Sequence, residues 1–464
     1  MTRTLHWFRD DLRAADNPSL LAARKHAEAP GDILGVYILD EHTPGIRPLG
    51  GAAKWWLHQA LCSLRENLAA CGIPLLIRQG GPHALLPALA ADTGADRVHW
   101  SRRYGGAERE LDAGVKRELR DRGLTAESFS ATLLHEPWTI QTTTGGPYKV
   151  FTPFWKALSQ RDIPPPQDAP QPLGELNQST SALTESGVSL GEIESLSLQP
   201  TAPNWAHTWP TIWDPTEAGG HHRLETFIEE QAASYHDQAQ YPGAGATSRL
   251  SAYLRFGQLS PQQVWHSAGA VPHAESKTRF RTELGWRDFS WHLLYHFPEL
   301  PRSNMRAEFD NYPWKVPEED PQTFRAWTAG QTGFPLADAG LRELWATGHM
   351  HNRVRMVTAS LLVKNLGIHW RAGEAWFWDT LVDADAASNP VNWQWVAGSG
   401  ADAAPYFRIF NPERQQKRFD PDFRYIRTWV PEHDSAEYPE PLVDLQLSRQ
   451  NALADYAALR GDGR

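Results

Sequence analysis

The first 130 residues alternate short apolar runs with helical patterns, and this alternation constrains the fold more than any other feature of the sequence. The apolar runs are TLHWF, DILGVYIL, PLLIRQ, DRVHWS and ESFSATLL. Helical patterns such as AAKWWLHQALCSLRENLAACG lie between them. Strands that alternate with helices pair in parallel, with helices covering both faces. We therefore predict a doubly wound, Rossmann-like parallel sheet. No G-x-G-x-x-G follows a strand, so a dinucleotide is expected to bind elsewhere.

The remainder of the chain divides into a linker and a helical region. Residues 160–203 are rich in Pro, Ser, Gln and Glu, which is typical of a surface linker. Beyond residue 220 strand signals almost vanish and helical periodicity takes over, as in the apolar stripe Met350, Val354, Val357 and Leu361. We predict an α/β domain at 1–130, an interdomain linker at 131–220 and an all-α domain at 221–464.

Composition limits the function classes. The formal net charge of −10 argues only weakly against nucleic acid, because residues 161–200 hold six acids and one base. Residues 350–364 hold three bases and no acid, and a local basic face attracts phosphate within about 8–10 Å. The two cysteines, Cys62 and Cys71, do not make a metal site, and no run is long enough to cross a bilayer. With no secretory signal at the N-terminus, we expect a cytoplasmic protein without a metal.

In the stretch YPGAGATSRLSAYLRFGQLSP, small residues precede a candidate anion-binding site. Hydroxyls, free backbone N–H groups and a helix dipole would suit a phosphate or pyrophosphate there. An ordinary capped helix is the simpler interpretation of this segment alone. The residues concerned are Thr247, Ser248, Arg249, Leu250 and Ser251.

Two further segments place chemistry on helix faces. In FRTELGWRDFSWHLLYHFP, Glu283, Trp286 and Arg287 fall at i, i+3 and i+4, a set that suits a ligand-facing surface better than a core or a solvated face. In GHMHNRVRMVTASLL, Asn352 and Met356 share one face.

Arg353 and Arg355 flank Asn352 and Met356, and Asp383 and Asp385 follow nearby in the chain. A buried ion pair between Arg355 and an aspartate and a ligand-binding role explain this pattern equally well.

The segment SNPVNWQWVAGSG holds two indoles, Trp393 and Trp395, on either side of one Gln. Two residues apart means roughly 200° of rotation in a helix and opposite faces in a strand. The two rings must therefore contact different neighbours, which are core, ligand or one of each.

In this order the segments resemble the DNA photolyase and cryptochrome family, and the resemblance covers nearly the whole chain. The strings that carry it are HWFRDDLRAADNPSL, PYKVFTPFWK, TSRLSAYLRFGQLSP, TELGWRDF, GFPLADAGLRELWATGHMHNRVRM, WQWVAGSGADAAPYFRIFNP and FDPDFRYIRTWVPE.

The resemblance implies that the helical domain binds FAD. Tyr235 and the segment Thr247 to Ser251 would hold the phosphates, and Asp383 and Asp385 the pyrimidine edge of the flavin. Arg355 would pair with Asp383.

Asn389 would face flavin N5. Because plant cryptochromes generally carry Asp there, Asn389 favours the repair branch of the family.

The resemblance also assigns the aromatic residues. Trp393, Trp370 and Trp314 would form an electron-transfer chain from the flavin toward the surface. Trp286 and Trp395 would stack on damaged bases flipped from the duplex, as photolyases are known to do.

The remaining pocket residues are predicted to select the lesion. Glu283 and Asn352 would bond the pyrimidine carbonyls, with Arg287 and Arg353 beside them. Relatives that repair the (6–4) lesion place His at the positions of Asn352 and Met356 and use it as an acid. We therefore predict a cyclobutane pyrimidine dimer photolyase, a monomer acting on UV-damaged DNA. The alternative is a blue-light receptor without repair activity.

The antenna chromophore is implied by one residue. Glu108 matches a folate-binding Glu of one subgroup, although the neighbouring Asn of that motif is Ala107 here. We predict methenyltetrahydrofolate, with a deazaflavin or no antenna as alternatives.

Overall fold

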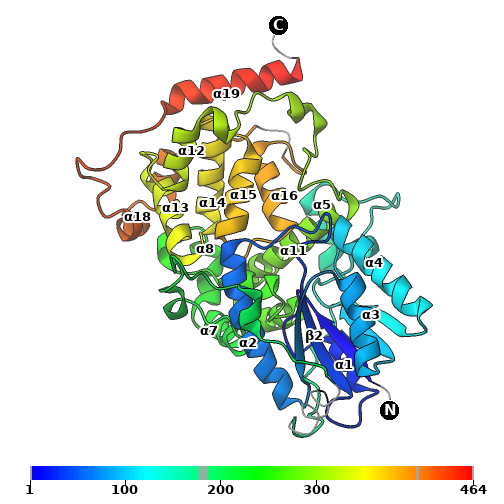
Figure 1. Cartoon of the computed structure of the whole chain (residues 1–464). Coiled ribbons are helices and arrows are strands. Elements are labelled where there is room, and N and C mark those ends of the chain that lie inside the picture. The colour runs from blue at the N-terminus through cyan, green and yellow to red at the C-terminus, as the bar shows by residue number, and fades with distance from the viewer. Residues whose placement is uncertain (1–2, 177–182, 184–186, 404–406, 462–464) are drawn as a thin grey trace. The chain divides into compact units, whose positions relative to one another are not determined.

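The alternating N-terminal region forms a five-stranded sheet in the computed structural model of the chain, which describes residues 3–176, 183, 187–403 and 407–461 (Figure 1). Its strands pair in parallel in the order β3-β2-β1-β4-β5. They are β1 (Thr4–Phe8), β2 (Ile33–Leu39), β3 (Leu75–Gln79), β4 (Arg97–Ser101) and β5 (Thr125–Phe129). The predicted doubly wound parallel sheet is confirmed.

The last strand differs from the prediction. The run ESFSATLL was expected to form it from residue 127 onward, whereas β5 ends at Phe129 and no strand covers residues 130–134. The edge strand is also less buried than β1 and β2, whose residues are all buried. The β4–β5 pairing ends with Phe129 opposite Ser101, the last residue of β4, so a longer β5 would have no partner on that edge.

Four helices accompany the sheet: α1 (Pro18–Arg24), α2 (Gly51–Ala70), α3 (Pro82–Thr93) and α4 (Gly106–Asp121). α1 begins at Asn17, whose side chain accepts a hydrogen bond from the Leu20 N–H, with Pro18 in the first turn. α1 packs on β1, β4 and β5, and α2 packs on β3. The apolar faces of α3 and α4 share one core with the strands, which includes Trp7 and Trp100.

Beyond residue 216 the regular secondary structure of the described residues is helical, apart from an isolated bridge between Lys315 and Ile368. Earlier in the chain, α5 (Phe151–Ser159) lies within the range expected to be a linker. Two π-helical turns occur, at Phe227–Gln231 and Leu361–Asn365. The other helices are α7 (Glu217–Thr226), α8 (Tyr235–Gln238), α9 (Ser251–Arg255), α10 (Pro261–Ser267), α11 (Ala274–His296), α12 (Pro321–Thr328), α13 (Pro335–Thr347), α14 (Asn352–Ser360), α15 (Trp370–Thr380), α16 (Ser388–Ala397), α17 (Pro412–Phe419), α18 (Arg424–Trp429) and α19 (Leu445–Arg460).

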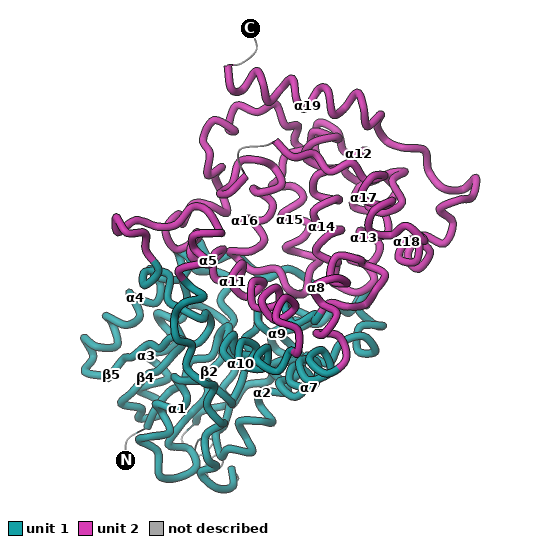
Figure 2. The backbone as a smooth tube through the Cα atoms, turned by 180° about the vertical axis from the view of Figure 1, so that it is seen from behind, with its two compact units in different colours: residues 1–140, 158–229, 248–271 teal, residues 141–157, 230–247, 272–464 magenta. Residues whose placement is uncertain are grey.

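The chain forms two compact units, coloured separately in Figure 2. Unit 1 comprises residues 1–140, 158–229 and 248–271, and unit 2 comprises 141–157, 230–247 and 272–464. This grouping differs from the expected domain ranges, because residues 158–229 and 248–271 belong to the same unit as the sheet. Polar contacts show why: Trp56 donates to Gln258 at 2.8 Å, and Arg255 pairs with Asp10 at 2.6 Å.

Unit 2 has its own core, built mainly from α13, α14, α15 and α16. The predicted stripe of Met350, Val354, Val357 and Leu361 is fully buried in it. The stripe keeps one face of α14 fixed in the core, which leaves Asn352 and Met356 on a different face.

None of the described helices is long and apolar enough to span a bilayer.

Candidate functional site

The residues expected at the flavin edge come together in unit 2. Arg355 donates to both carboxylate oxygens of Asp383, at 3.1 and 2.9 Å, and its Nε donates to the Met350 carbonyl at 2.7 Å. The Asp383 side chain is 6% exposed and that of Arg355 is 25% exposed. The ion pair between these residues is therefore present, in the two-pronged geometry that guanidinium groups favour.

Asp385 and Asn389 organise the start of α16, the helix that carries both indoles of the WQW motif. One oxygen of Asp385 accepts the N–H groups of Ala387 at 2.8 Å and Ser388 at 2.5 Å. The Asn389 amide nitrogen donates to the carbonyl and the carboxylate of Glu374, at 3.0 and 2.7 Å. Because both bonds use the nitrogen, the Asn389 amide oxygen is presented as an acceptor.

The segment expected to hold phosphates has an unusual backbone. Arg249 has φ of +52°, and the helix that follows it, α9, is five residues long. Thr247 belongs to unit 2, and Ser248 to Ser251 belong to unit 1. Tyr235, at the start of α8, is buried against Phe280, and burial raises the pKa of its hydroxyl.

The predicted face of α11 is reached by solvent. Glu283 and Trp286 are exposed, and Arg287 is half-buried. The Trp286 ring stacks on Phe151, with 3.5 Å between centroids and 9° between planes. Sequence reasoning missed Phe151, although it lies in the aromatic string PYKVFTPFWK. The two rings form a partly exposed aromatic pair at the surface of α11.

Glu283 is exposed and at the same time closely surrounded by protein. Desolvation raises the pKa of its carboxyl group, while Arg279 opposes the shift.

The first turn of α14 is held by a histidine that sequence reasoning did not single out. Nδ1 of His351 accepts the Arg353 N–H at 3.1 Å, and Nε2 lies 3.1 Å from the Ala239 carbonyl. Burial lowers the pKa of His351 to about 4, so the ring is neutral at physiological pH and Nε2 donates. This fixes Asn352, exposed at the first position of α14, and half-buried Met356 one turn later.

Three arginines gather near this turn, Arg353, Arg418 and Arg279, and the last of them also acts on the carboxyl group of Glu283. Arg353 donates to the Gln240 side chain at 3.0 Å, and its guanidinium lies 4.4 Å from the Phe419 ring centroid, with Arg418 at 5.1 Å. Arg279 donates to the His236 carbonyl at 2.7 Å. Burial lowers the pKa of Arg353, and the positive charges of Arg418 and Arg279 lower it further. Like charges this close favour the binding of an anion.

Trp393 and Trp395 have the different surroundings that their spacing predicted. Trp393 is 2% exposed and packs edge-on against Phe377, with 5.0 Å between centroids, and against Trp327 at 6.2 Å. Trp395 is half-buried and lines a pocket, with the Arg408 guanidinium 5.3 Å from its ring. One indole belongs to the core and the other faces a pocket.

The other two tryptophans of the expected electron-transfer chain lie on either side of a histidine. The His369 ring is 5.7 Å from that of Trp370 and 5.0 Å from that of Trp314. Trp370 is fully buried and Trp314 half-buried. Trp393 packs against Gly373, one turn along α15 from Trp370, so the first two rings lie on packed helices.

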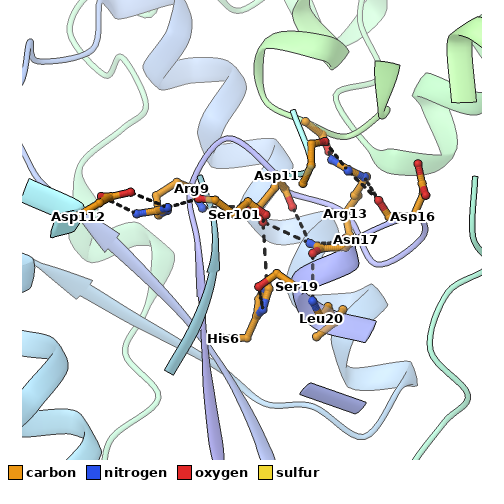
Figure 3. A network of polar contacts seen from close by, with 12 residues as sticks. His6, Arg9, Asp11, Arg13, Asp16, Asn17, Ser19, Leu20, Ser101 and Asp112 are labelled. Carbon is orange, nitrogen blue, oxygen red and sulfur yellow. Dashed lines mark hydrogen bonds and ion pairs between the residues drawn. The ribbon is translucent and has the colours of Figure 1, made fainter. Parts of the chain in front are cut away.

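In unit 1, the chain's own side chains fill the carboxyl ends of β1 and β4, where the strand order changes direction (Figure 3). Arg9 pairs with Asp112 at 3.1 Å, and Arg103 reaches the same carboxylate at 2.7 Å. Asp11 accepts from Ser101 at 2.6 Å and from the Arg9 N–H at 2.9 Å. Burial would raise the pKa of Asp112, but Arg103 and Arg9 outweigh it and lower that pKa.

Glu108 lies in the first turn of α4, and its carboxylate folds back against Gly105, the residue that precedes the helix. An acidic group there is stabilised by the helix dipole, so this position has a structural explanation as well as the folate-binding one.

Comparisons with known proteins agree with this architecture. The family model described as DNA photolyase matches residues 4–172, and the one described as FAD binding domain of DNA photolyase matches residues 280–437. A deoxyribodipyrimidine photo-lyase of Agrobacterium fabrum is 44% identical over 485 residues, covering 98% of this chain and 97% of the relative.

A solved bacterial class III photolyase from Agrobacterium tumefaciens superposes with a TM-score of 0.91 at 42% identity, over 99% of this chain and 98% of that one. Cryptochrome-2 of Arabidopsis thaliana is 33% identical over 93% of this chain and 70% of its own length.

A parallel-sheet unit together with a helical unit that holds the Arg355–Asp383 pair is the architecture of the photolyase class of flavoproteins. The chain belongs to the DNA photolyase family, whose members act on DNA, and it is a photo-lyase enzyme with an FAD-binding domain. The predicted family, enzyme class and flavin cofactor are confirmed at this level.

Proposed function

We propose that this enzyme repairs cyclobutane pyrimidine dimers by light-driven electron transfer from reduced FAD. The observation that carries the proposal is the exposure of Glu283, Trp286 and Asn352 on α11 and α14, both of which pack on α16. An acid, an indole and an amide held at the surface of fixed helices suit a pyrimidine pair, which offers flat rings and carbonyl oxygens.

The unit 2 residues fit the flavin. Arg355 and Asp383 offer a donor and an acceptor, and Asn389 offers an amide oxygen, all of them held by hydrogen bonds within the unit. Such a set matches the alternating N–H and C=O groups of a flavin edge. When bound, reduced FAD excited by light would supply one electron to the dimer and regain it after the two carbon–carbon bonds of the cyclobutane ring have broken.

The chain's own residues would lower the energy of the dimer that has gained this electron. Negative charge then builds up on the pyrimidine carbonyl oxygens, where hydrogen-bond donors stabilise it. The Asn352 amide would donate one of these bonds, and Glu283 would donate another in its protonated form; both side chains are exposed. Met356 offers no proton where a (6–4) enzyme carries an acid, so the reaction is confined to electron transfer.

DNA would bind through charge and stacking. The cluster of Arg279, Arg353 and Arg418 would neutralise phosphates. Trp286 and Trp395 would each stack on a base of the lesion, at about 1–3 kcal/mol per base. Phe151 stiffens the Trp286 platform by covering part of its ring.

The buried tryptophans would reduce the flavin from its oxidised form. We propose the route Trp393, Trp370, Trp314, with His369 between the last two rings. Indoles lose an electron readily, and buried rings in close succession shorten each step.

For the antenna we propose methenyltetrahydrofolate, with a deazaflavin as the alternative. The crevice at the switch point of a doubly wound sheet is where flavin-type cofactors bind. Here Arg9, Arg103 and Asp112 occupy that region, which favours the folate. Extraction of the chromophore and its absorption spectrum distinguish the two.

A lesion-selectivity assay tests the proposed function. Reduced enzyme is illuminated with duplexes that carry either one cyclobutane thymine dimer or one (6–4) product, and each is scored for restored thymines against a dark control. We expect restoration of the cyclobutane dimer alone. Repair of the (6–4) product would assign the other substrate, and no repair of either would favour the photoreceptor alternative.

A further inference from the structure

Lys364 carries a buried amino group for which neither the fold nor the proposed function gives a reason. It lies in the π-helical turn that follows α14 and is 3% exposed. Among the described residues no carboxylate pairs with it. Burial lowers its pKa well below the usual range, and nearby Arg306 lowers it further.

A cation buried without a counter-charge is costly, and an apolar side chain of similar shape would be more stable in its place. The presence of lysine here therefore requires an explanation other than stability.

The contacts of Lys364 lead to the end of α16. Its Nζ donates to the carbonyl of Ala397, the last residue of that helix, at 2.5 Å. Arg306 donates to the next carbonyl, that of Gly398, at 2.9 Å. Two cations thus meet the negative end of the helix dipole.

Lys364 also holds the loop that follows the helix. Its Nζ lies 3.0 Å from the centroid of the Phe407 ring, a cation–π contact. Phe407 in turn stacks on Tyr456 of α19, with 4.3 Å between centroids and 6° between planes. The residue after Phe407 is Arg408, whose guanidinium lies by the ring of Trp395.

The end of α16 and this loop form the pocket at Trp395. The helix ends two residues after Trp395, at Ala397, and the Gly398 N–H reaches the carbonyls of Gln394 at 2.9 Å and of Trp395 at 3.3 Å. Lys364 contacts Ala397 and Phe407, and each of these is next in the chain to a residue that lines the pocket, Gly398 and Arg408 respectively. The pocket is lined by Trp395, Val396, Gly398, Ala403, Arg408 and Phe410.

We propose that Lys364 is a positioning residue for lesion recognition: by binding the last carbonyl of α16 and the ring of Phe407, it fixes Trp395 and Arg408 at the spacing that receives a damaged base. This inference rests on the proposed function. An amino group suits the task, because its N–H groups reach a carbonyl oxygen and an aromatic face at once, whereas an apolar residue contacts only the latter.

Replacement of the amine separates positioning from stability. Lys364→Met keeps the length of the side chain and removes the charge, so we expect an unchanged or higher melting temperature and normal FAD content. Affinity in the dark for DNA with a cyclobutane dimer should fall about three- to tenfold. A loss of this size corresponds to part of the binding free energy that one stacked base contributes. Affinity for undamaged DNA should not change. Lys315→Met, at a side chain 55% exposed, is the matched control and should change none of these quantities.

A double-mutant cycle tests whether Lys364 acts through Trp395. In a Trp395→Ala background the loss caused by Lys364→Met should disappear, because no indole remains to be positioned. An equal loss in both backgrounds would overturn the proposal, as would an unchanged affinity or a uniform loss accompanied by a lower melting temperature.

A second variant and a reference measurement complete the test. If Lys364→Met does not fold, Phe407→Leu removes the aromatic face while leaving the amine, and an unchanged preference for dimer-containing DNA would then reject the role. If the wild-type enzyme itself shows no preference for the dimer, it is the proposed function that fails, which the wild-type measurement reveals before any variant is compared.

Discussion

Single residues in this protein have distinct surroundings even when they are neighbours in the chain. Trp393 is buried in the core of unit 2, and Trp395, two residues later, faces a pocket beside Arg408. Helical rotation alone separates them. The same rule places the buried stripe of α14 away from Asn352 and Met356.

Replacing Glu283 should separate cofactor binding from repair. Glu283→Ala removes a hydrogen-bond donor to the lesion, so repair yield per absorbed photon should fall and dark affinity for dimer-containing DNA should drop about tenfold. FAD content should stay constant. Glu275→Ala, in the exposed first turn of α11, is the control. A yield equal to wild type would remove Glu283 from the mechanism.

Replacing Trp393 should separate the supply of electrons from repair. Phenylalanine fills much of the same space but is far harder to oxidise, so Trp393→Phe should abolish most light-driven reduction of oxidised flavin. Repair by enzyme that has been chemically reduced beforehand should be nearly unaffected. Absorption spectroscopy follows the first process and thymine restoration the second. Photoreduction at the wild-type rate would mean that electrons take another route.

At the level of elements, the contact between α15 and α16 sets the geometry of the tryptophan route. Gly373 lets the two helices approach: a Cβ added there would lie 2.1 Å from Cη2 of Trp393 and 2.6 Å from a methyl group of Leu362. No side chain fits in that space without movement of the indole.

Gly373→Ala should therefore displace Trp393. The clash should cost about 1–3 kcal/mol, partly offset by about 1 kcal/mol from the better helix propensity of alanine. We expect a lower melting temperature and slower flavin photoreduction. Gly367→Ala is the control for replacing a glycine where no clash results. Nothing lies within 4 Å of the added Cβ, although the φ of +71° at this position adds backbone strain. If Gly373→Ala leaves the photoreduction rate unchanged, the contact does not position the indole.

At the scale of the whole molecule, charge is distributed unevenly. The net charge is −10, yet Arg279, Arg353 and Arg418 gather beside the candidate lesion-binding residues. Affinity for DNA should therefore fall as the salt concentration rises. A plot of the logarithm of the binding constant against the logarithm of the salt concentration should be linear, and its slope should reflect the number of phosphates contacted.

Arg418→Gln should reduce the magnitude of that slope by the contribution of about one phosphate contact, without changing the preference for damaged DNA. Arg325→Gln, at an exposed arginine of α12, should leave the slope unchanged. A slope that stays at the wild-type value in Arg418→Gln would remove this arginine from the DNA-binding surface.

Buried histidines should make the protein acid-sensitive. Burial lowers the pKa of His6 in unit 1 and of His351 in unit 2 to about 4, against about 6.5 in the unfolded chain. As pH falls from 6.5 toward 4, the unfolded state takes up protons first, so the free energy of unfolding decreases. The loss approaches about 1.4 kcal/mol per pH unit for each histidine.

Denaturant unfolding between pH 7 and pH 5 measures this loss. In His351→Asn, an asparagine that can still cap α14 replaces the titrating ring, and the slope should be shallower than in wild type. Equal stability at pH 7 and pH 5 would contradict the prediction.

The fold could be predicted from the sequence because its signals are local. Apolar runs of five to eight residues with helical patterns between them defined the sheet, and helical periodicity without strand signals defined the later part of the chain. The end of β5 could not be predicted, since it depends on the length of its partner strand. The assignment of residues 248–271 to the sheet unit depends on contacts such as Trp56 with Gln258, which no local pattern encodes.

The candidate site was predictable where one helix carries it and less so elsewhere. The spacing of Glu283, Trp286 and Arg287, and the pairing of Arg355 with Asp383, followed from helix geometry and the family resemblance. Phe151 and Lys364 were missed because each acts across a large sequence separation, on Trp286 and on Ala397 respectively.

The most direct test of the central claim is the number of thymines restored per absorbed photon in an oligonucleotide that carries one cyclobutane thymine dimer, using fully reduced enzyme and a dark control. The account predicts light-dependent restoration in wild type and a much lower yield in Glu283→Ala at equal flavin content. Absence of light-dependent restoration from enzyme whose spectrum shows fully reduced flavin would contradict it.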